Sequence, residues 1–441
     1  MTVERLGVPT APIVTQRFVD LVKTISYKKG MPNQRFTFVP HPVAGRPPEL
    51  CNKYIRGKDP VTGKAIVDEL IAALTSPLTA EEKKTGFLIR PTQPRLLEPE
   101  TATNLARLFE NNGWTDGLPI VLPTEERVAE MLKGTSHKPD EIVGTMRPSP
   151  PHEAWEFTVE MVAANAVMAG AKPEYLPVIL ALASTGVTSL FSSTTSFARM
   201  VVVNGPITKE INMNSGIGAL GPFNTANSTI GRAWTLISKN LGGGGTPGET
   251  YLGSQGCNFN YNNICFPENE ERLPAGWKAF HVQKGYKAGE SVVSTFTGWN
   301  LIHSGGFTTK HTDIIRQSML PFSSGRAQVT LLLDPIVASD LKNYEGFDTK
   351  EKLSEWLMKN AFTPARQYWA SHSDNLKKAQ EGIEPFASWL KVPSDAFVYL
   401  PASSFKPDPP IEIIVVGGET NAFFLVGDFR HVSSASVDNW R

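Results

Sequence analysis

PIVTQRFVDLVKTISYKKGMPNQRFTFV, residues 12–39, has the pattern of a strand, a helix and a second strand. Residues 12–15 are a short apolar strand, and the apolar side chains at positions 18, 19, 21, 22 and 25 then recur at helical spacing. Residues 30–33, Gly-Met-Pro-Asn, end that helix with turn residues, and residues 35–39 form the next strand. This succession is typical of the βαβ unit of a parallel sheet. The stretch therefore predicts an α/β fold that starts with a small N-terminal βαβ unit.

The region after this unit predicts an amphipathic segment and then a linker. Residues 66–74 carry their apolar side chains at positions 66, 67, 70, 71 and 74. Residues 79–104 are polar and contain Pro91, Pro94 and Pro99, a composition typical of a linker. We place a domain boundary near residue 95. This gives an N-terminal unit with its linker, residues 1–95, and a larger α/β domain, residues 96–441.

The larger domain alternates between helical and extended patterns. Thr124 is expected to cap a helix, and two buried helices are expected over residues 153–169 and 173–183. Strands are expected at residues 200–203, 292–296, 328–334, 411–416 and 423–426, and helices at residues 227–241, 350–360 and 364–379. This alternation predicts layered α/β structure but does not reveal the order of the strands.

Charge and composition exclude several classes of partner. Lys plus Arg equals Asp plus Glu at 43 each, so no global field attracts nucleic acid or an anionic membrane. The longest uncharged run, residues 175–198, is truly apolar only over residues 176–183, which is too short to span a bilayer. With three cysteines, at least one thiol is free. A reducing, cytoplasmic setting is expected, with no nucleic-acid or membrane partner.

Residues 253–271, GSQGCNFNYNNICFPENEE, hold the densest group of reactive side chains. Cys257 and Cys265 are candidate nucleophiles, but nearby carboxylates raise the pKa of a thiol and so oppose the reactive thiolate. Glu268 and Glu270 are therefore the stronger candidates, as a catalytic acid and base. The alternatives are that each cysteine is a small buried hydrophobe, and that the carboxylates belong to a solvated turn or bind a divalent cation.

A second candidate site is the start of the predicted helix near Asn227. Asn224, Asn227 and Ser228 lie where free backbone N–H groups can receive a carboxylate or phosphate, and Arg232 follows one turn later. Residues 216–221, GIGALG, match the dinucleotide-binding pattern but lack the preceding strand and the acidic residue downstream. Residues 417–418, Gly-Gly, follow a predicted strand and would let a ligand approach its carboxyl end.

The N-terminal strings at residues 7–15, 29–33 and 38–45 resemble the later half of the UGSC-type domain. That family is named for a selenocysteine- or cysteine-containing Gly-Ser-Cys motif, and the resemblance implies a redox or nucleophilic role for it. The chain is expected to start after the point where that motif falls, so His41 alone is carried over as a candidate catalytic residue. Further strings, at residues 114–121, 165–175, 203–207 and 268–270, resemble uncharacterised UGSC-associated proteins. Through the last two strings, Asn204 and Asn269 join the candidate substrate-binding residues.

These observations lead to two hypotheses. The first is an enzyme that acts on a small, polar, carboxylated molecule, as a lyase or hydratase or by thiol redox chemistry, with no cofactor and no metal site predicted. The second is a non-catalytic subunit that complements a separate UGSC-type partner. A parallel sheet that lacks its first strand exposes an edge that another chain can cover. We therefore expect a homo-oligomer or a UGSC-type partner chain.

Overall fold

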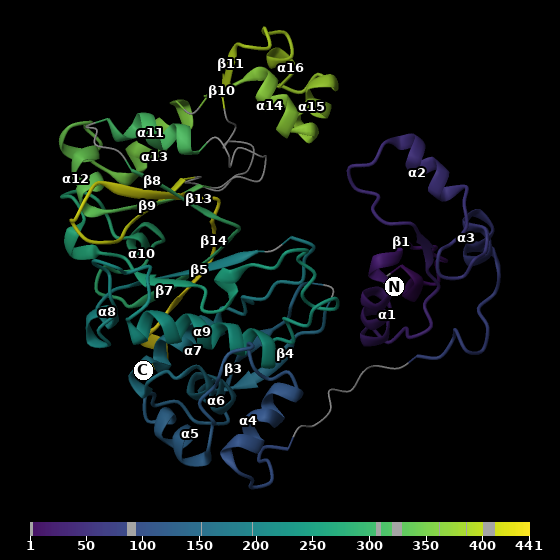
Figure 1. The fold of residues 1–441 in the computed structure, drawn as a ribbon, viewed down its shortest axis with the longest axis horizontal. Helices are drawn as coiled ribbons and strands as arrows, with labels where there is room; N and C mark the ends of the chain where they lie inside the picture. The colour runs from purple at the N-terminus through teal and green to yellow at the C-terminus, as the bar shows by residue number, and fades with distance from the viewer. Residues whose placement is uncertain are drawn as a thin grey trace.

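The N-terminal unit has the predicted βαβ arrangement. The computed structural model describes residues 3–85, 94–150, 152–195, 197–305, 310–319, 329–360, 362–384, 386–399 and 411–441. Strand β1 (Ile13–Thr15) pairs in parallel with β2 (Thr37–Val39), and α1 (Val19–Lys28) connects them (Figure 1). Helices α2 (Pro48–Ile55) and α3 (Ile66–Thr75) follow. The backbone N–H of Phe38 donates to the buried carboxylate of Asp59 at 2.6 Å, which joins β2 to the turn before α3.

The larger region is built on two four-stranded sheets. The first has the order β14-β7-β5-β6, and the second the order β12-β9-β13-β8. The strands of the first sheet are β14 (Arg430–Ser436), β7 (Val292–Gly298), β5 (Ala198–Asn204) and β6 (Ile264–Pro267). Those of the second are β12 (Ile411–Val415), β9 (Val329–Leu333), β13 (Phe423–Gly427) and β8 (Leu301–Gly305).

The two sheets pack face to face between two layers of helices. Successive side chains of a strand point to opposite faces of the sheet, so each strand contributes side chains to two hydrophobic cores. Met200 of β5 packs with Leu332 of β9 in one hydrophobic cluster, between the sheets. Val201 of β5 faces the opposite way, toward the helices α6 (Val159–Ala169), α7 (Leu176–Ser184) and α9 (Thr225–Asn240). Leu331 of β9 faces α11 (His311–Ser318), α12 (Pro335–Asn343) and α13 (Lys350–Asn360). The order helices, sheet, sheet, helices (Figure 1) confirms the predicted α/β fold.

The helices of these layers and the smaller elements around them complete the larger region. Their bounds are α4 (Ala102–Asn111), α5 (Glu125–Leu132), β3 (Ile142–Met146), β4 (Trp155–Thr158), α6 (Val159–Ala169), α7 (Leu176–Ser184), α8 (Ile207–Glu210), α9 (Thr225–Asn240), α10 (Phe280–Gln283), α11 (His311–Ser318), α12 (Pro335–Asn343), α13 (Lys350–Asn360), β10 (Phe362–Pro364), α14 (Ala365–Ser371), α15 (Ser373–Gln380), α16 (Phe386–Trp389) and β11 (Phe397–Tyr399). Helices α14, α15 and α16 and the β10-β11 pair form a small lobe with a cluster of its own.

Both sheets repeat one pattern of strand directions. In the first, β5 is parallel to β6 and antiparallel to β7, which is antiparallel to β14. In the second, β9 is parallel to β12 and antiparallel to β13, which is antiparallel to β8. β8 follows β7 along the chain and β14 follows β13, yet each pairs in the other sheet. This exchange of outer strands ties the two sheets together.

Several predicted boundaries need correction. The helix expected from residue 153 begins at Val159, because Trp155–Thr158 pairs with β3 as strand β4. The helix expected over residues 364–379 is two helices, because His372 between them has φ −128° and ψ 60°, outside the helical region. Thr124 caps α5 as predicted, accepting from the N–H of Arg127.

The Gly417-Gly418 pair has a packing role. A side chain at Gly418 would place its Cβ 2.2 Å from Cγ1 of Ile217, and the N–H of Gly417 donates to the carbonyl of Ser215 at 2.8 Å. The absence of side chains therefore lets the loop around residues 215–217 approach the end of β12. That loop occupies the place the sequence suggested for a ligand.

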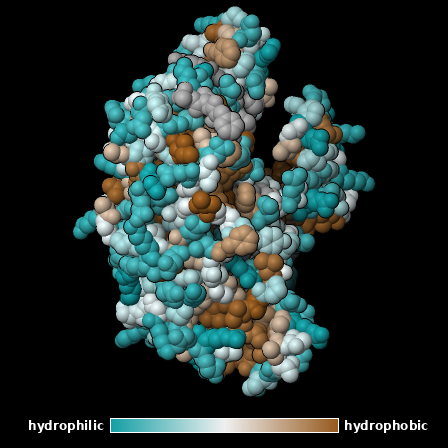
Figure 2. Space-filling view, turned by 60° about the vertical axis from the view of Figure 1, so that its left-hand side comes forward, coloured by the Kyte–Doolittle hydropathy of each residue, from teal (hydrophilic) through white to brown (hydrophobic). Residues whose placement is uncertain are grey.

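The surface is mixed in character. Figure 2 shows a largely hydrophilic or neutral face, on which apolar side chains gather in separate patches. Within the described ranges, none of the helices has both the length and the apolar character needed to cross a bilayer.

Candidate functional site

Glu268 lies just beyond β6, in the seam where the two sheets meet. Its Oε1 accepts from Nζ of Lys350 at 2.6 Å, and its Oε2 accepts from the N–H of Phe280 at 2.6 Å and from Nδ2 of Asn204 at 2.8 Å. The side chains of Glu268 and Lys350 are 0% and 1% exposed. A buried carboxylate persists only when it is paired and hydrogen-bonded in this way. The structure thus places Glu268 in an internal ion pair, with no exposed oxygen for a substrate.

Glu270 shares a partner with Glu268. Its Oε1 accepts from Nδ2 of Asn204 at 2.9 Å and from the N–H of Gly205 at 2.7 Å, and its side chain is 30% exposed. Nδ1 of the fully buried His281 lies 3.9 Å from the same oxygen. Asn269, between the two acids, donates from Nδ2 to the carbonyl of Gly417 at 3.0 Å. The structure therefore brings Asn204, Glu268, Asn269 and Glu270 together, mainly to join the two sheets.

The two cysteines of the opening segment are in environments that oppose a thiolate. Cys265 is 6% exposed on the helix-covered face of β6, and burial raises the pKa of its thiol to about 12. Cys257 is half-buried beside the core between the sheets, and burial also raises its pKa. Both thiols are therefore protonated at neutral pH. Because the thiolate is the nucleophile, both are weakly reactive there.

We expect Cys265 to resist thiol reagents in the folded protein. At pH 7.5, a disulfide reagent such as 5,5′-dithiobis(2-nitrobenzoate) should leave Cys265 unmodified while the protein is native, because the thiol is both buried and protonated. All three cysteines should react in denaturant. Mass spectrometry of the labelled peptides measures this. Rapid native labelling of Cys265 would show that the β6 environment differs from the one described.

The predicted anion anchor, Asn224 to Arg232, is occupied by the protein itself. Asn224 caps α9 by accepting from the N–H of Asn227 at 2.9 Å, and Asn227 donates to the carbonyls of Asn214 and Ala219. Arg232 forms a bidentate pair with Asp116, at 2.8 and 3.0 Å, whose side chain is 2% exposed. Ser228 lies within the first turn, where its N–H donates to the carbonyl of Asn224. These groups stabilise the start of α9, and the ligand site expected there from the sequence stays a prediction.

His41 lies in the N-terminal unit. It follows β2, it is exposed, and its Nδ1 is 3.0 Å from Oγ1 of Thr15, the last residue of β1. The two side chains therefore meet at the carboxyl ends of two parallel strands, the place where α/β sheets commonly bind ligands.

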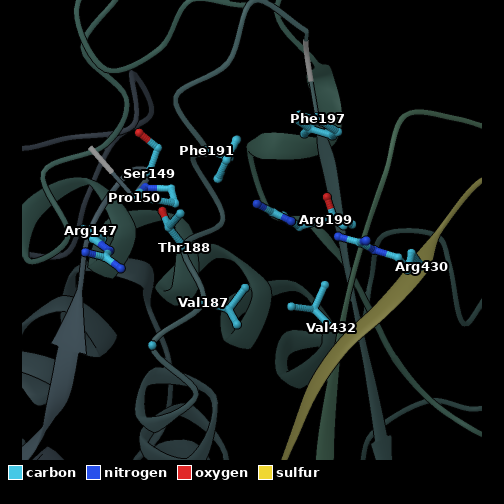
Figure 3. Close-up of a pocket in the computed structure, with 12 residues that line it drawn as sticks. Arg147, Ser149, Pro150, Val187, Thr188, Phe191, Phe197, Arg199, Arg430 and Val432 are labelled. Atoms are coloured by element: carbon cyan, nitrogen blue, oxygen red, sulfur yellow. The ribbon is translucent and has the colours of Figure 1, made fainter. Parts of the chain in front are cut away.

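The first sheet carries a further cavity that contains three arginines (Figure 3). Its volume is about 280 Å³. We call it the arginine pocket. Its lining is formed by Arg147, Ser149, Pro150, Gly186, Val187, Thr188, Phe191, Phe197, Arg199, Thr297, Arg430 and Val432. No Asp or Glu is among these lining residues, so within the described structure the pocket is cationic and otherwise apolar or neutral.

Strand register sets two of the arginines on one face of the sheet. Arg199 of β5 is directly opposite Thr297 of β7, and Thr297 is directly opposite Arg430 of β14. Directly opposite residues share one face of a sheet, so both arginines project to the same side, about 10 Å apart at their Cα atoms. A register shift between His431 and Ser433 inserts Val432 as a bulge next to them. Bulges of this kind commonly redirect side chains beside functional sites.

Arg199 is the unusual one of the three arginines in the pocket. It is 4% exposed, its Nε has no hydrogen-bond partner in the described structure, and its guanidinium lies 5.7 Å from the centre of the Phe191 ring. Burial, with a smaller contribution from the like charge of Arg430, lowers the pKa of Arg199 to about 10. Even so, the guanidinium stays charged at neutral pH. A buried cation without an anionic partner is costly, which makes this position a candidate anion site.

A serine and a histidine add proton-transfer capacity to the pocket. Oγ of Ser149, a lining residue, is 2.7 Å from Nδ1 of His152, and both residues are buried. The pocket and the Glu268 cluster lie at opposite ends of β5, because Arg199 and Asn204 are five residues apart, or about 17 Å along a strand. The two candidate sites are therefore separate.

Sequence reasoning missed the arginine pocket. One signal was present, since Arg199 is the single charge in the apolar run FARMVVV, residues 197–203. A charged residue within a buried strand is rare unless it has a specific role. The other two arginines are 52 positions before and 231 positions after it, so spacing alone could not have joined them.

Comparison with known proteins identifies the N-terminal unit. Residues 1–75 match the UGSC family. This confirms the UGSC-type resemblance for that segment, which includes His41 and Thr15. No curated protein and no solved structure matches the chain. Among the described residues, no group of three or more His, Cys, Asp or Glu side chains is arranged to hold a metal ion.

Proposed function

We propose that the protein is an enzyme that binds a small carboxylated molecule in the arginine pocket. The observation that carries this proposal is Arg199, a buried guanidinium that faces a cavity and has no acidic partner among the described residues. A planar carboxylate fits a guanidinium in a bidentate arrangement, and such charge-assisted bonds are stronger than neutral ones. A bound carboxylate would give the Arg199 guanidinium the anionic partner that it lacks among the described residues.

The reactive groups available to a molecule in this pocket differ from those first suggested by the sequence. Glu268, Glu270 and the two cysteines are not lining residues, whereas Ser149 is. Its hydroxyl is held by His152, and an imidazole can accept or return a proton near neutral pH. In this proposal Arg199 binds and orients the substrate carboxylate. The Ser149–His152 pair accepts a proton from the substrate or returns one to it.

Ligand-dependent stability tests the binding part. A ligand that binds only the folded state raises its stability in proportion to the logarithm of its concentration. Benzoate and butanoate, titrated at constant ionic strength, should raise the melting temperature of the wild-type protein, while sodium chloride added as the matched control should not. If neither carboxylate changes the melting temperature more than the salt does, the proposal is wrong.

A specific observation favours the second hypothesis, a subunit that complements a UGSC-type partner. Helix α3 exposes Val67, Ile71 and Leu74 by 43%, 55% and 48%. These positions, four and three residues apart, form one apolar stripe on the helix. The sheet beside it has only the strands β1 and β2, so each leaves an edge unpaired within the described unit. Such a surface can bind another chain by helix packing and by strand addition.

Co-expression tests this second role. A UGSC-type chain that carries the Gly-Ser-Cys motif should form a defined complex with this protein in size-exclusion chromatography with light scattering. Ile71→Asp, in the exposed stripe, should abolish that complex, and Glu271→Gln, at an exposed site in the larger region, should not. If only homo-oligomers of this chain are found, or if Ile71→Asp has no effect, the subunit hypothesis is wrong.

A further inference from the structure

The arginine pocket contains more positive charge than one carboxylate neutralises. Arg147, Arg199 and Arg430 line a cavity of about 280 Å³, and no carboxylate is among its described lining residues. A monocarboxylate bound to Arg199 would therefore leave Arg147 and Arg430 without an anionic group of the ligand. A molecule with two anionic groups matches the charge better.

The three arginines come from two opposite walls. Arg199 and Arg430 project from one sheet face on either side of Thr297, whereas Arg147 follows β3 on the segment that also carries Ser149 (Figure 3). Between these walls lie side chains without charge, including Val187 and Phe191. The pocket is thus cationic at two places and uncharged between them.

The three arginines also differ in depth. Arg199 is 4% exposed, while Arg147 and Arg430 are exposed residues at the rim. A cavity of about 280 Å³ is at the small end of ligand sites, which typically measure about 300–1,000 Å³. The space therefore suits one compact molecule.

We propose that the ligand is a small dicarboxylate with an apolar spacer. One carboxylate lies deep against Arg199, with Arg430 beside it, and the second lies across the cavity against Arg147. The apolar spacer contacts Val187 and Phe191. This inference rests on the proposed function, and it adds the substrate class: a compact dianion and not a monoacid.

Matched pairs of ligands separate the two proposals. We would measure, by isothermal titration calorimetry, the affinities of benzoate, benzene-1,3-dicarboxylate and benzene-1,4-dicarboxylate, and of butanoate, succinate and glutarate. One additional charge-assisted contact predicts that the better dicarboxylate of each set binds about 10- to 100-fold more tightly than its monoacid. The advantage should shrink as salt is raised, because Arg147 is exposed to screening ions.

Substitutions of single arginines test which arginine binds each carboxylate of the ligand. Arg147→Met should lower the affinity of the dicarboxylate to that of the monoacid, and Arg199→Met should remove binding of both. Arg95→Met is the matched control, because Arg95 is 64% exposed and pairs with Glu160 outside the pocket. It should change neither affinity.

The outcomes distinguish the claims. If the monoacids bind as tightly as the diacids, or if Arg147→Met weakens both equally, the dicarboxylate inference is wrong and the carboxylate pocket stands. If no carboxylate binds the wild-type protein, both are wrong. Circular dichroism of each variant, compared with the wild type, excludes loss of folding as the cause.

Discussion

Arg199→Met should abolish carboxylate binding and, at the same time, stabilise the ligand-free protein. Methionine keeps much of the length of arginine without its charge, and no hydrogen bond to Nε is lost among the described residues. Replacing a buried charged group by an apolar one of similar volume is often stabilising, so we expect a gain of about 1–3 kcal/mol in the free energy of unfolding. A residue that served only the fold would behave in the opposite way.

Chemical denaturation and calorimetry measure the two halves of this prediction. Urea unfolding gives the change in stability, and titration with benzoate gives the change in binding. Arg95→Met, at an exposed ion pair, should leave the benzoate affinity unaltered. A large loss of stability in Arg199→Met would mean that the guanidinium has a partner within the fold. Retained carboxylate affinity would mean that the ligand binds elsewhere.

Glu268→Gln should destabilise the protein by about 3–5 kcal/mol, because it leaves the buried ammonium of Lys350 without its counter-charge. The glutamine amide would also direct N–H groups at donors that now reach the carboxylate, among them the N–H of Phe280. By contrast, the exposed pair of Glu271 and Lys209 should contribute little, so Glu271→Gln is the control.

A double variant shows whether the pair is the cause. Glu268→Gln combined with Lys350→Met removes both charges, and it should be less destabilised than the sum of the single variants. If the losses in the free energy of unfolding of the two single variants simply add in the double variant, Glu268 and Lys350 do not act as an ion pair. Unchanged stability of Glu268→Gln together with lost activity would instead return Glu268 to the role of a catalytic acid.

The sequence predicted the central strands but not the exchanged ones. Strands β5, β9 and β12 are buried on both faces, so their sequences are mainly apolar and give a strong signal. Strand β14, Arg430–Ser436, is partly exposed and rich in serine, and it has no such run. Its position in the sheet depends on its pairing with β7, a long-range contact that local pattern does not encode.

The candidate site was predictable only in part. The density of reactive groups in residues 253–271 did identify a buried polar cluster, at Glu268 and Asn204. That cluster is dense because two sheets meet there and their polar groups need partners, which composition cannot distinguish from catalysis. The arginine pocket joins three arginines from distant parts of the chain, and only the folded arrangement brings them together.

A crystal structure with the tightest dicarboxylate of the calorimetric series tests the central claim most directly. The account predicts one carboxylate within hydrogen-bonding distance of the Arg199 guanidinium, and the second facing Arg147. A ligand bound at the start of α9, beside His41, or at Glu270, with the arginine pocket empty, would contradict it.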